Sequence, residues 1–254
     1  RTTVRQALEA LPMPAASWLT LLKQQGALVE AWLDGGETLS SPSVQGTIHP
    51  GGMGGRPSVE VLSTHEQELG GASGQTYLGC RFPCEEAYRL ELMRHGLAVG
   101  EALAAEGALE RYAVDFIARR FDDHWDVQAI EVNLRQGGTT HPYMALSAIT
   151  AGQLDPATGL YCSPTGQPLH YVATDNLCAP GLRGLLPIDL IDIVAEAGLH
   201  YDPARLRGSV FHLLGCLSEY GKLGMTCIGR SAEEAAAVYA ATERELMRGA
   251  AGKR

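Results

Sequence analysis

Three polar side chains alternate along one short segment of the sequence. Glu131, Asn133 and Arg135 are separated by the single apolar residues Val132 and Leu134. On a β-strand, side chains at every second position leave the backbone on the same side. The spacing therefore predicts a strand that presents a carboxylate, an amide and a fixed cation to one face, a set suited to binding a metal ion and phosphate.

An earlier alternating segment, residues 112–118, carries Asp115 and is separated from the first by a polar stretch suited to a hairpin loop. If the two segments pair as antiparallel strands, the numbers of any two residues that face each other add up to the same total. The position of the turn sets that total. A turn at Asp123 or the next residue then places Asp115 opposite Glu131 or Asn133. The register therefore predicts that three oxygen-bearing side chains occupy neighbouring positions on one face of a sheet.

Two neighbouring carboxylates repel each other, and burying them unpaired costs several kcal/mol. A divalent cation removes that cost. Oxygen ligands that include an amide suit Mg²⁺ or Mn²⁺, and a magnesium ion held by few protein groups completes its shell with substrate phosphates. Arg135 would then lie where a transferred phosphate or a developing oxyanion needs a cation. The alternative is a solvated sheet face with an incidental ion pair.

An Asp on one strand and Glu-x-Asn on the next resemble the metal site of the ATP-grasp superfamily of carboxylate ligases. Residues 27–37, Ala-Leu-Val-Glu-Ala-Trp-Leu-Asp-Gly-Gly-Glu, look like the hinge of that superfamily. Taken alone, this piece predicts an apolar strand followed by a Gly-Gly turn. The resemblance implies that adenine binds the hinge and ribose binds an acid after the turn: Glu30, Ala31, Trp32 and Leu33 for adenine, and Glu37 for ribose.

Further strings extend the likeness to the pheganomycin-type peptide-ligase branch with its C-terminal domain. The likeness covers most of the chain from about Gly26 onward, and residues 131–142 are its most specific part. The other strings are Ser41-Pro-Ser-Val-Gln45, residues 62–83, Thr174-Asp-Asn-Leu177 and Gly221-Lys-Leu-Gly224.

The residues after the metal strand are candidates for holding the substrate. Backbone amides at a helix start favour a carboxylate or an oxyanion. The substrate candidates are Gly137, Gly138, Thr139, Thr140, His141 and Arg81, and His65, Gln67 and Lys222 are further candidates for which a structural role is the alternative.

The resemblance implies a ligase that uses ATP with Mg²⁺ or Mn²⁺ to activate a carboxylate as an acyl phosphate, which an amine then attacks. The implied partners are small molecules, an amino acid or a peptide, and a homo-oligomer stays open. Phosphoryl transfer needs positioning and charge neutralisation, which Arg135 and the metal ligands would supply. Two alternatives are a phosphotransferase on the same scaffold and a non-catalytic module that binds a nucleotide or carboxylate.

The expected fold class is α+β: the C-terminal lobe of an ATP-grasp enzyme, with an antiparallel sheet flanked by helices, plus a mostly helical C-terminal extension. We expect residues 1–26 to end the preceding lobe, 27–152 to form the lobe with the hinge and metal site, and 153–254 to form a C-terminal domain packed on it. The family's first lobe brings lysines on strands, whereas only Lys23 precedes the hinge here. The chain therefore looks like part of something longer.

Local signals predict the remaining elements. Apolar residues at helical spacing predict helices within residues 1–25, interrupted at Pro12 and Pro14, and from Cys84 to Ala105. The Gly-rich residues 49–57 predict a hairpin tip, because they fit no phosphate-binding fingerprint. Other helices are expected over 140–152, from Pro187 to a stop at Gly198, from Asp202-Pro203, and from a capping box at Ser231–Glu234.

Composition excludes several classes of partner. The net charge of -9 and the pI near 5.4 argue against nucleic acid and anionic membranes, because phosphate groups favour clustered Lys and Arg. No run of eighteen apolar residues and no secretory signal is present, so the cytoplasm is the expected location. The six cysteines form no Cys-x-x-Cys pair, which favours reduced, packed thiols.

Overall fold

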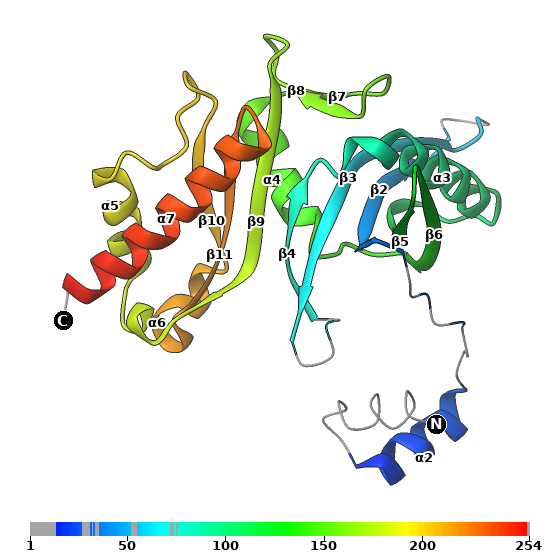
Figure 1. The fold of residues 1–254 in the computed structure, drawn as a ribbon, viewed down its shortest axis with the longest axis horizontal. Coiled ribbons are helices and arrows are strands. Elements are labelled where there is room, and N and C mark those ends of the chain that lie inside the picture. Colours follow the sequence, from blue (N-terminus) through cyan, green and yellow to red (C-terminus); the bar gives the residue numbers. More distant parts are fainter. Residues whose placement is uncertain are drawn as a thin grey trace.

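One large antiparallel sheet organises the molecule (Figure 1). The computed structural model describes residues 14–26, 31, 33, 36–51, 55–71, 74 and 76–252. Within these residues the sheet has 11 strands, in the order β1-β5-β2-β3-β4-β9-β11-β10, with β6 added beside β5 and the β7–β8 hairpin beside β9. Strands from both halves of the chain therefore share one sheet, joined where β4 pairs with β9.

The strands are β1 (Thr38–Ser40), β2 (Pro42–His49), β3 (Ser58–Gly70), β4 (Thr76–Phe82), β5 (Glu110–Phe121), β6 (His124–Asn133), β7 (Gln153–Asp155), β8 (Leu160–Cys162), β9 (Pro168–Cys178), β10 (Gly208–His212) and β11 (Lys222–Gly229). The helices are α2 (Ala15–Gln25), α3 (Glu86–Ala105), α4 (Thr140–Thr150), α5 (Pro187–Glu196), α6 (Leu217–Tyr220) and α7 (Ala232–Gly252), with 3₁₀ turns at Pro180–Leu182 and Leu214–Cys216.

Helices cover the two faces of the sheet. On one face, which we call the α3/α7 face, α3 packs Tyr88 and Leu92 against Val44 and Val114, and α7 packs against β9 and β11. The opposite face, the α4 face, carries a second core in which aromatic and aliphatic side chains of α4 meet those of β4, β8 and β9: Tyr143, Leu146, Phe82, Tyr161 and Tyr171. In Figure 1, α7 crosses in front of β9 to β11 and α4 lies behind them.

A bulge sets the register of the β5–β6 hairpin. From Phe121↔His124 to Phe116↔Ala129 the paired residue numbers sum to the same value, which would place Asp115 opposite Ile130. The register shifts after Phe116, so Asp115 pairs with Glu131. The hairpin turns between Asp122 and Asp123, slightly earlier than predicted, and the extra residue of the bulge compensates for the difference, as bulges re-aim the side chains that follow them. Asp115 and Glu131 therefore share a face, as predicted.

The α+β class and the antiparallel sheet flanked by helices are confirmed. The C-terminal part contains the helices α5, α6 and α7, and it also contributes β9, β10 and β11, which continue the sheet and were not predicted. β11 is buried at seven successive positions, and a strand covered on both faces lacks the alternation that identifies strands in a sequence. The helix predicted from Asp202-Pro203 is wrong: the Asp202 carboxylate accepts hydrogen bonds from the N–H groups of Ala204 and Arg205 and forms a turn instead.

Most other local predictions are confirmed. α2 begins after Pro14, α3 and α4 lie where expected, α5 begins at Pro187, and β2 pairs with β3 as an antiparallel neighbour. The helix predicted before Pro14 and residues 52–54 of the predicted hairpin tip lie outside the described residues. At α7, the Glu234 N–H donates to Ser231 Oγ at 3.2 Å, as in a capping box, although the Glu234 carboxylate accepts from the N–H of Arg230. All six cysteines are free. Within the described ranges, no helix is long and apolar enough to cross a membrane.

Candidate active site

Asp115 is the centre of a polar cluster on the α4 face. The Gln67 amide of β3 donates to Asp115 Oδ1 at 2.9 Å, and the Asn133 amide of β6 donates to Asp115 Oδ2 at 3.1 Å. Glu131 lies directly opposite Asp115 in the register. Two of the three predicted ligands thus touch, and the third is the cross-strand neighbour of Asp115.

Asp115 is a partly buried carboxylate that lies beside a second carboxylate. Burial raises the pKa of Asp115, and the nearby Glu131 carboxylate raises it further. Hydrogen bonds from Ser43 and Gln67 and the positive charge of Arg135 lower the same pKa without cancelling the effect of burial. The site therefore favours any added positive charge that both carboxylates can share.

Glu131 and Arg135 lie at the rim of the cluster and are exposed, whereas Asn133 is half-buried. The Arg135 guanidinium donates only to the neighbouring Gln136 carbonyl oxygen, at 3.3 Å, among the described residues. Its charge is close enough to Asp115 to lower the pKa of that carboxyl. Arg135 is thus positioned beside the carboxylates and remains available to an anion.

The loop after β6 is tied to β2 by a buried network. Gln45 donates to Thr139 Oγ1 at 2.6 Å and accepts from Thr140 Oγ1 at 2.8 Å, while the Gly137 N–H donates to Thr140 Oγ1 at 3.0 Å. The two threonine hydroxyls therefore anchor the loop. Since Thr140 is the first residue of α4, the network fixes where the positive end of this helix points.

Sequence reasoning assigned no role to Ser43 or Gln45. Ser43 pairs with Asp115 across β2 and β5, and Gln45 lies two residues further along on the same face. Their alternation in Ser43-Val-Gln45 was the available signal, because it matches that of the metal strand. Without knowing that β2 neighbours β5, the sequence could not connect them to Asp115.

Gly138 and His141 flank the anchored threonines. A Cβ on Gly138 would lie 2.6 Å from the Tyr77 ring of β4, so the glycine allows the loop to approach that ring closely. His141 is exposed, and its ring centroid lies 4.1 Å from that of His212 on β10. The loop therefore reaches both halves of the sheet.

Arg81 and His65 are not brought into the cluster. Arg81 pairs with Glu66 in the register and forms an ion pair with Glu68 at 3.2 Å on the α3/α7 face. His65 is fully buried, its Nε2 lies 2.6 Å from the Tyr171 hydroxyl, and burial lowers its pKa to about 3. The sequence could not show which face Arg81 reaches. That face is set by the pairing of β4 with β3, in which Arg81 lies opposite Glu66 and not opposite His65.

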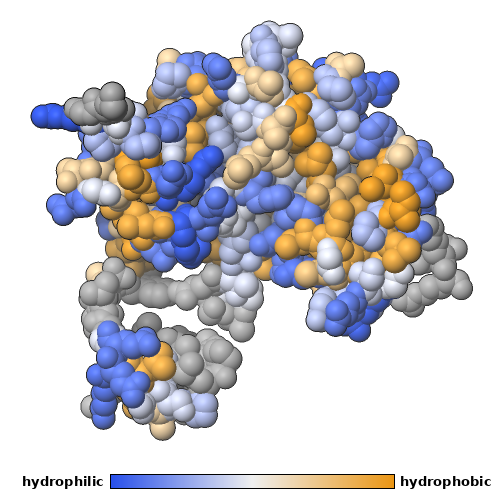
Figure 2. Space-filling view, turned by 180° about the vertical axis from the view of Figure 1, so that it is seen from behind, coloured by the Kyte–Doolittle hydropathy of each residue, from blue (hydrophilic) through white to orange (hydrophobic). Residues whose placement is uncertain are grey.

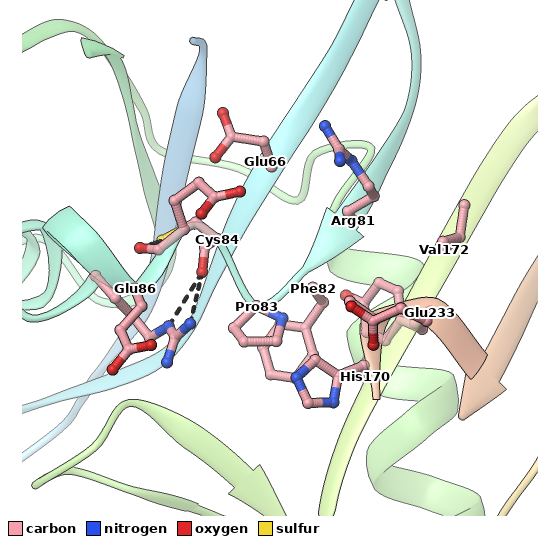
Figure 3. A pocket seen from close by; sticks show the side chains of 13 residues that line it. Glu66, Arg81, Phe82, Pro83, Cys84, Glu86, His170, Val172 and Glu233 are labelled. Carbon is pink, nitrogen blue, oxygen red and sulfur yellow. Dashed lines mark hydrogen bonds between the residues drawn. The ribbon is translucent and has the colours of Figure 1, made fainter. Parts of the chain in front are cut away.

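Arg81 instead lines a pocket of about 360 Å³ on the α3/α7 face, between the first turns of α3 and α7 (Figure 3). Glu66, His170 and Glu233 also line it. Among these groups, the Glu66 carboxylate accepts a hydrogen bond from Tyr88 at 2.6 Å, and burial raises the Glu66 pKa. The pocket lies across the sheet from Asp115.

The hinge candidates are only partly described. Glu30 and Trp32 lie outside the described residues, Ala31 is exposed and Leu33 is half-buried, and neither of the latter two lies in a strand. The exposed Glu37 donates its N–H to the Arg120 carbonyl oxygen at 2.8 Å. Lys222 begins β11, where it faces Cys178 across the sheet. The roles assigned to these residues stay predictions.

Comparison with known proteins gives a family match within the C-terminal part of the chain. Residues 189–242, which contain β10 and β11, match the family described as PGM1 C-terminal domain. The chain is also 31% identical over 241 residues to an L-propargylglycine–L-glutamate ligase from Streptantibioticus cattleyicolor, a match that covers 95% of this chain and 47% of that protein. The predicted likeness to peptide ligases is confirmed, and the chain spans about half the length of the curated relative it matches.

Solved structures with a similar arrangement include two bacterial enzymes. N5-carboxyaminoimidazole ribonucleotide synthetase from Thermus thermophilus is 15% identical, with a TM-score of 0.48, over 92% of this chain and 58% of that chain. The phosphoribosylaminoimidazole carboxylase ATPase subunit from Aquifex aeolicus is 14% identical, with a TM-score of 0.47, over 82% and 56%.

Proposed function

We propose that the chain is the catalytic part of an ATP-dependent ligase that joins the carboxylate of one amino acid or peptide to the amine of another. The observation that carries the proposal is the Asp115–Glu131 pair with Asn133 and Arg135, placed directly before a loop anchored at the start of a helix. The similarity to a named amino acid ligase supports the same class of reaction.

The residues present fit a magnesium ion. Asp115 and Glu131 offer carboxylate oxygens, and Asn133 offers an amide oxygen once its amide turns. Burial and the Glu131 charge raise the pKa of Asp115, so an added cation would stabilise both carboxylates. When bound, Mg²⁺ would neutralise the charge of the ATP phosphates. Mn²⁺ has the same ligand preference and is the alternative metal.

The protein groups around this position would hold the reacting acid. Arg135 offers a planar set of N–H donors to the transferred phosphoryl group, and the first turn of α4 favours negative charge. Gly138 is exposed beside the anchored threonines, where its N–H can donate to a carboxylate oxygen. These groups orient the acid and stabilise charge that develops on it, which is what phosphoryl transfer requires.

We further propose that the nucleotide site lies beside the Asp115 cluster. The hinge residues Ala31 to Leu33 and Glu37 would bind adenine and ribose at its edge. Three apolar side chains at the end of β6 are between 42% and 60% exposed, namely Ile130, Val132 and Leu134, and Figure 2 shows apolar surface over this hairpin. Val132 pairs with Val114 of the α3/α7 face, so this apolar surface includes the side of β6 that faces away from Asp115. Apolar surface of this kind favours cover by another part of a protein. Dependence on ATP and six free thiols support action in the cytoplasm.

The test is acid-dependent release of ADP by the complete protein with MgATP and a panel of amino acids. Glu131→Gln keeps the size of the side chain and removes one shared negative charge. We expect it to reduce turnover by about 100-fold or more. The substitution removes a charged ligand of the metal, and the metal would then stabilise the charge of the phosphates in the transition state less well. Glu101→Gln, at an exposed position of α3 on the other side of the sheet, is the matched control. Full turnover by Glu131→Gln would overturn the assignment, and a stable phosphorylated acid as the final product would indicate a phosphotransferase.

A further inference from the structure

Two histidines from opposite halves of the chain meet on the α4 face. His141 lies in the first turn of α4, directly after the loop proposed to hold the acid, and His212 ends β10 within the PGM1 C-terminal domain segment. Their ring centroids are 4.1 Å apart, with an angle of 45° between the rings. His141 is exposed and His212 is half-buried, so the pair is accessible from the side of the loop.

Gly224 makes this meeting possible. It pairs with His212 across β10 and β11, and a Cβ at this position would lie 2.1 Å from His212 Nε2. The imidazole therefore lies across the bare backbone of β11. On the other side of Gly224 the register with β9 shifts, so that Asp175 and Asn176 together oppose it. The two C-terminal strings that the sequence singled out thus converge beside His212.

The groups around the pair suit a cation more than an anion. Burial lowers the pKa of His212 to about 4, and the neighbouring His141 contributes to this shift, so His212 is neutral near pH 7 and offers a lone pair. Tyr77 lies against Gly138 in the same loop; burial raises the Tyr77 pKa, and the nearby Asp175 carboxylate contributes to this shift. An acceptor nitrogen and an aromatic ring therefore lie close to the loop, with the Asp175 carboxylate near that ring, and each of these groups attracts an ammonium group.

We propose that His141 and His212 form the subsite that holds the ammonium group of the acceptor amine, with His212 supplied by the C-terminal domain. The proposal rests on the proposed ligase function and deepens it. The Gly137–Thr140 loop and Arg135 bind the acid. His141 directly follows this loop, so the histidine pair would hold the amine beside the acyl phosphate. The C-terminal domain thereby contributes to the choice of the second substrate.

Hydroxylamine separates this role from the steps before it. This small nucleophile is largely uncharged near pH 7, traps acyl phosphates as hydroxamates and needs no ammonium subsite. In the complete protein, His212→Phe should raise the KM for the amine substrate about tenfold or more, which is the effect of losing a hydrogen bond to a charged group. Acid-dependent hydroxamate formation should stay at the wild-type rate.

Two further variants keep the test independent of one substitution. Gly224→Ala places a methyl group where the His212 ring lies and should give the same KM effect with an intact histidine. His212→Gln retains an acceptor atom and should recover part of the affinity. His170→Phe is the matched control, because His170 is a half-buried histidine on the opposite face of the sheet. The unfolding midpoint of each variant identifies any that fail to fold.

The outcomes are distinct. An unchanged amine KM in His212→Phe and Gly224→Ala would overturn the subsite, and so would an equal loss of hydroxamate and amide, which would place the pair in the activation of the acid. A wild-type protein that releases no ADP with any acid would instead overturn the proposed ligase function, and the subsite with it.

Discussion

The buried carboxyl and imidazole side chains of this protein are of two kinds. Asp115 and Glu66 have pKa values that burial raises, so in their folded environment they hold protons more strongly. His65, His170 and His212 have pKa values that burial lowers, so they resist protonation. The first kind lies in candidate sites or at a helix start, whereas His65 lies entirely in the core against Phe82 and Tyr171. Desolvation alone therefore does not mark a functional residue.

His65 should make the fold sensitive to acid. Its pKa is about 3 when folded and 6.5 when unfolded, so below pH 6.5 the unfolded chain binds a proton that the folded chain refuses. Stability from this group is complete above pH 6.5 and is lost as the pH falls toward 3. Between pH 7.5 and 5, wild type should lose about 2 kcal/mol more unfolding free energy than His65→Gln. Urea unfolding at the two pH values measures the difference, with His95→Gln on exposed α3 surface as the control. Equal losses in wild type and His65→Gln would contradict the prediction.

At the scale of elements, the anchoring of α4 to β2 decides where the substrate loop lies. Thr140→Val keeps the shape of the side chain but removes the hydroxyl that binds Gln45 and the Gly137 N–H. Leaving buried polar partners unpaired should lower the unfolding free energy by about 1–3 kcal/mol and raise the KM for the acid, with a smaller effect on nucleotide affinity. Thr158→Val, which removes an exposed hydrogen bond to Asp155, is the control. A variant with wild-type stability and acid KM would show that the network does not position the loop.

The β5–β6 hairpin shows how far sequence reasoning reaches. Alternation at Asp115, Glu131 and Asn133 predicted their shared face, because a period of two is a local property of strands. The bulge at the step between Asp115 and Phe116 was not predicted, and it changes the register by one residue. Likewise, nothing local shows that β2 lies beside β5 or that Gly224 accommodates His212, since these depend on pairings between distant strands. The face that Arg81 reaches could not be predicted for the same reason, because it depends on the register of β4 with β3.

At the scale of the whole molecule, the predicted boundary between residues 152 and 153 crosses a continuous core. Phe82 stacks on Tyr171 with centroids 4.9 Å apart, and Tyr143 meets Tyr161 edge to face at 5.9 Å. The sheet also continues from β4 to β9, where Thr174 Oγ1 donates to the Leu78 carbonyl oxygen at 2.7 Å. The aromatic core of the α4 face therefore belongs to both proposed domains.

This shared core predicts that the two parts unfold together. A protein ending at Gly152 would expose Phe82, Tyr143 and Leu146, which are otherwise buried by Tyr161, Leu169 and Tyr171. Since each large aromatic side chain contributes roughly 2 kcal/mol or more on burial, the truncated protein should lack cooperative unfolding. In the intact chain, hydrogen exchange of the β4 and β9 amides should report the same opening free energy, because neither strand keeps its partner when the other opens. A sharp unfolding transition of the truncated protein would contradict this prediction. So would β9 amides that exchange well before those of β4. Either result would show that residues 153–254 fold separately from a self-sufficient lobe.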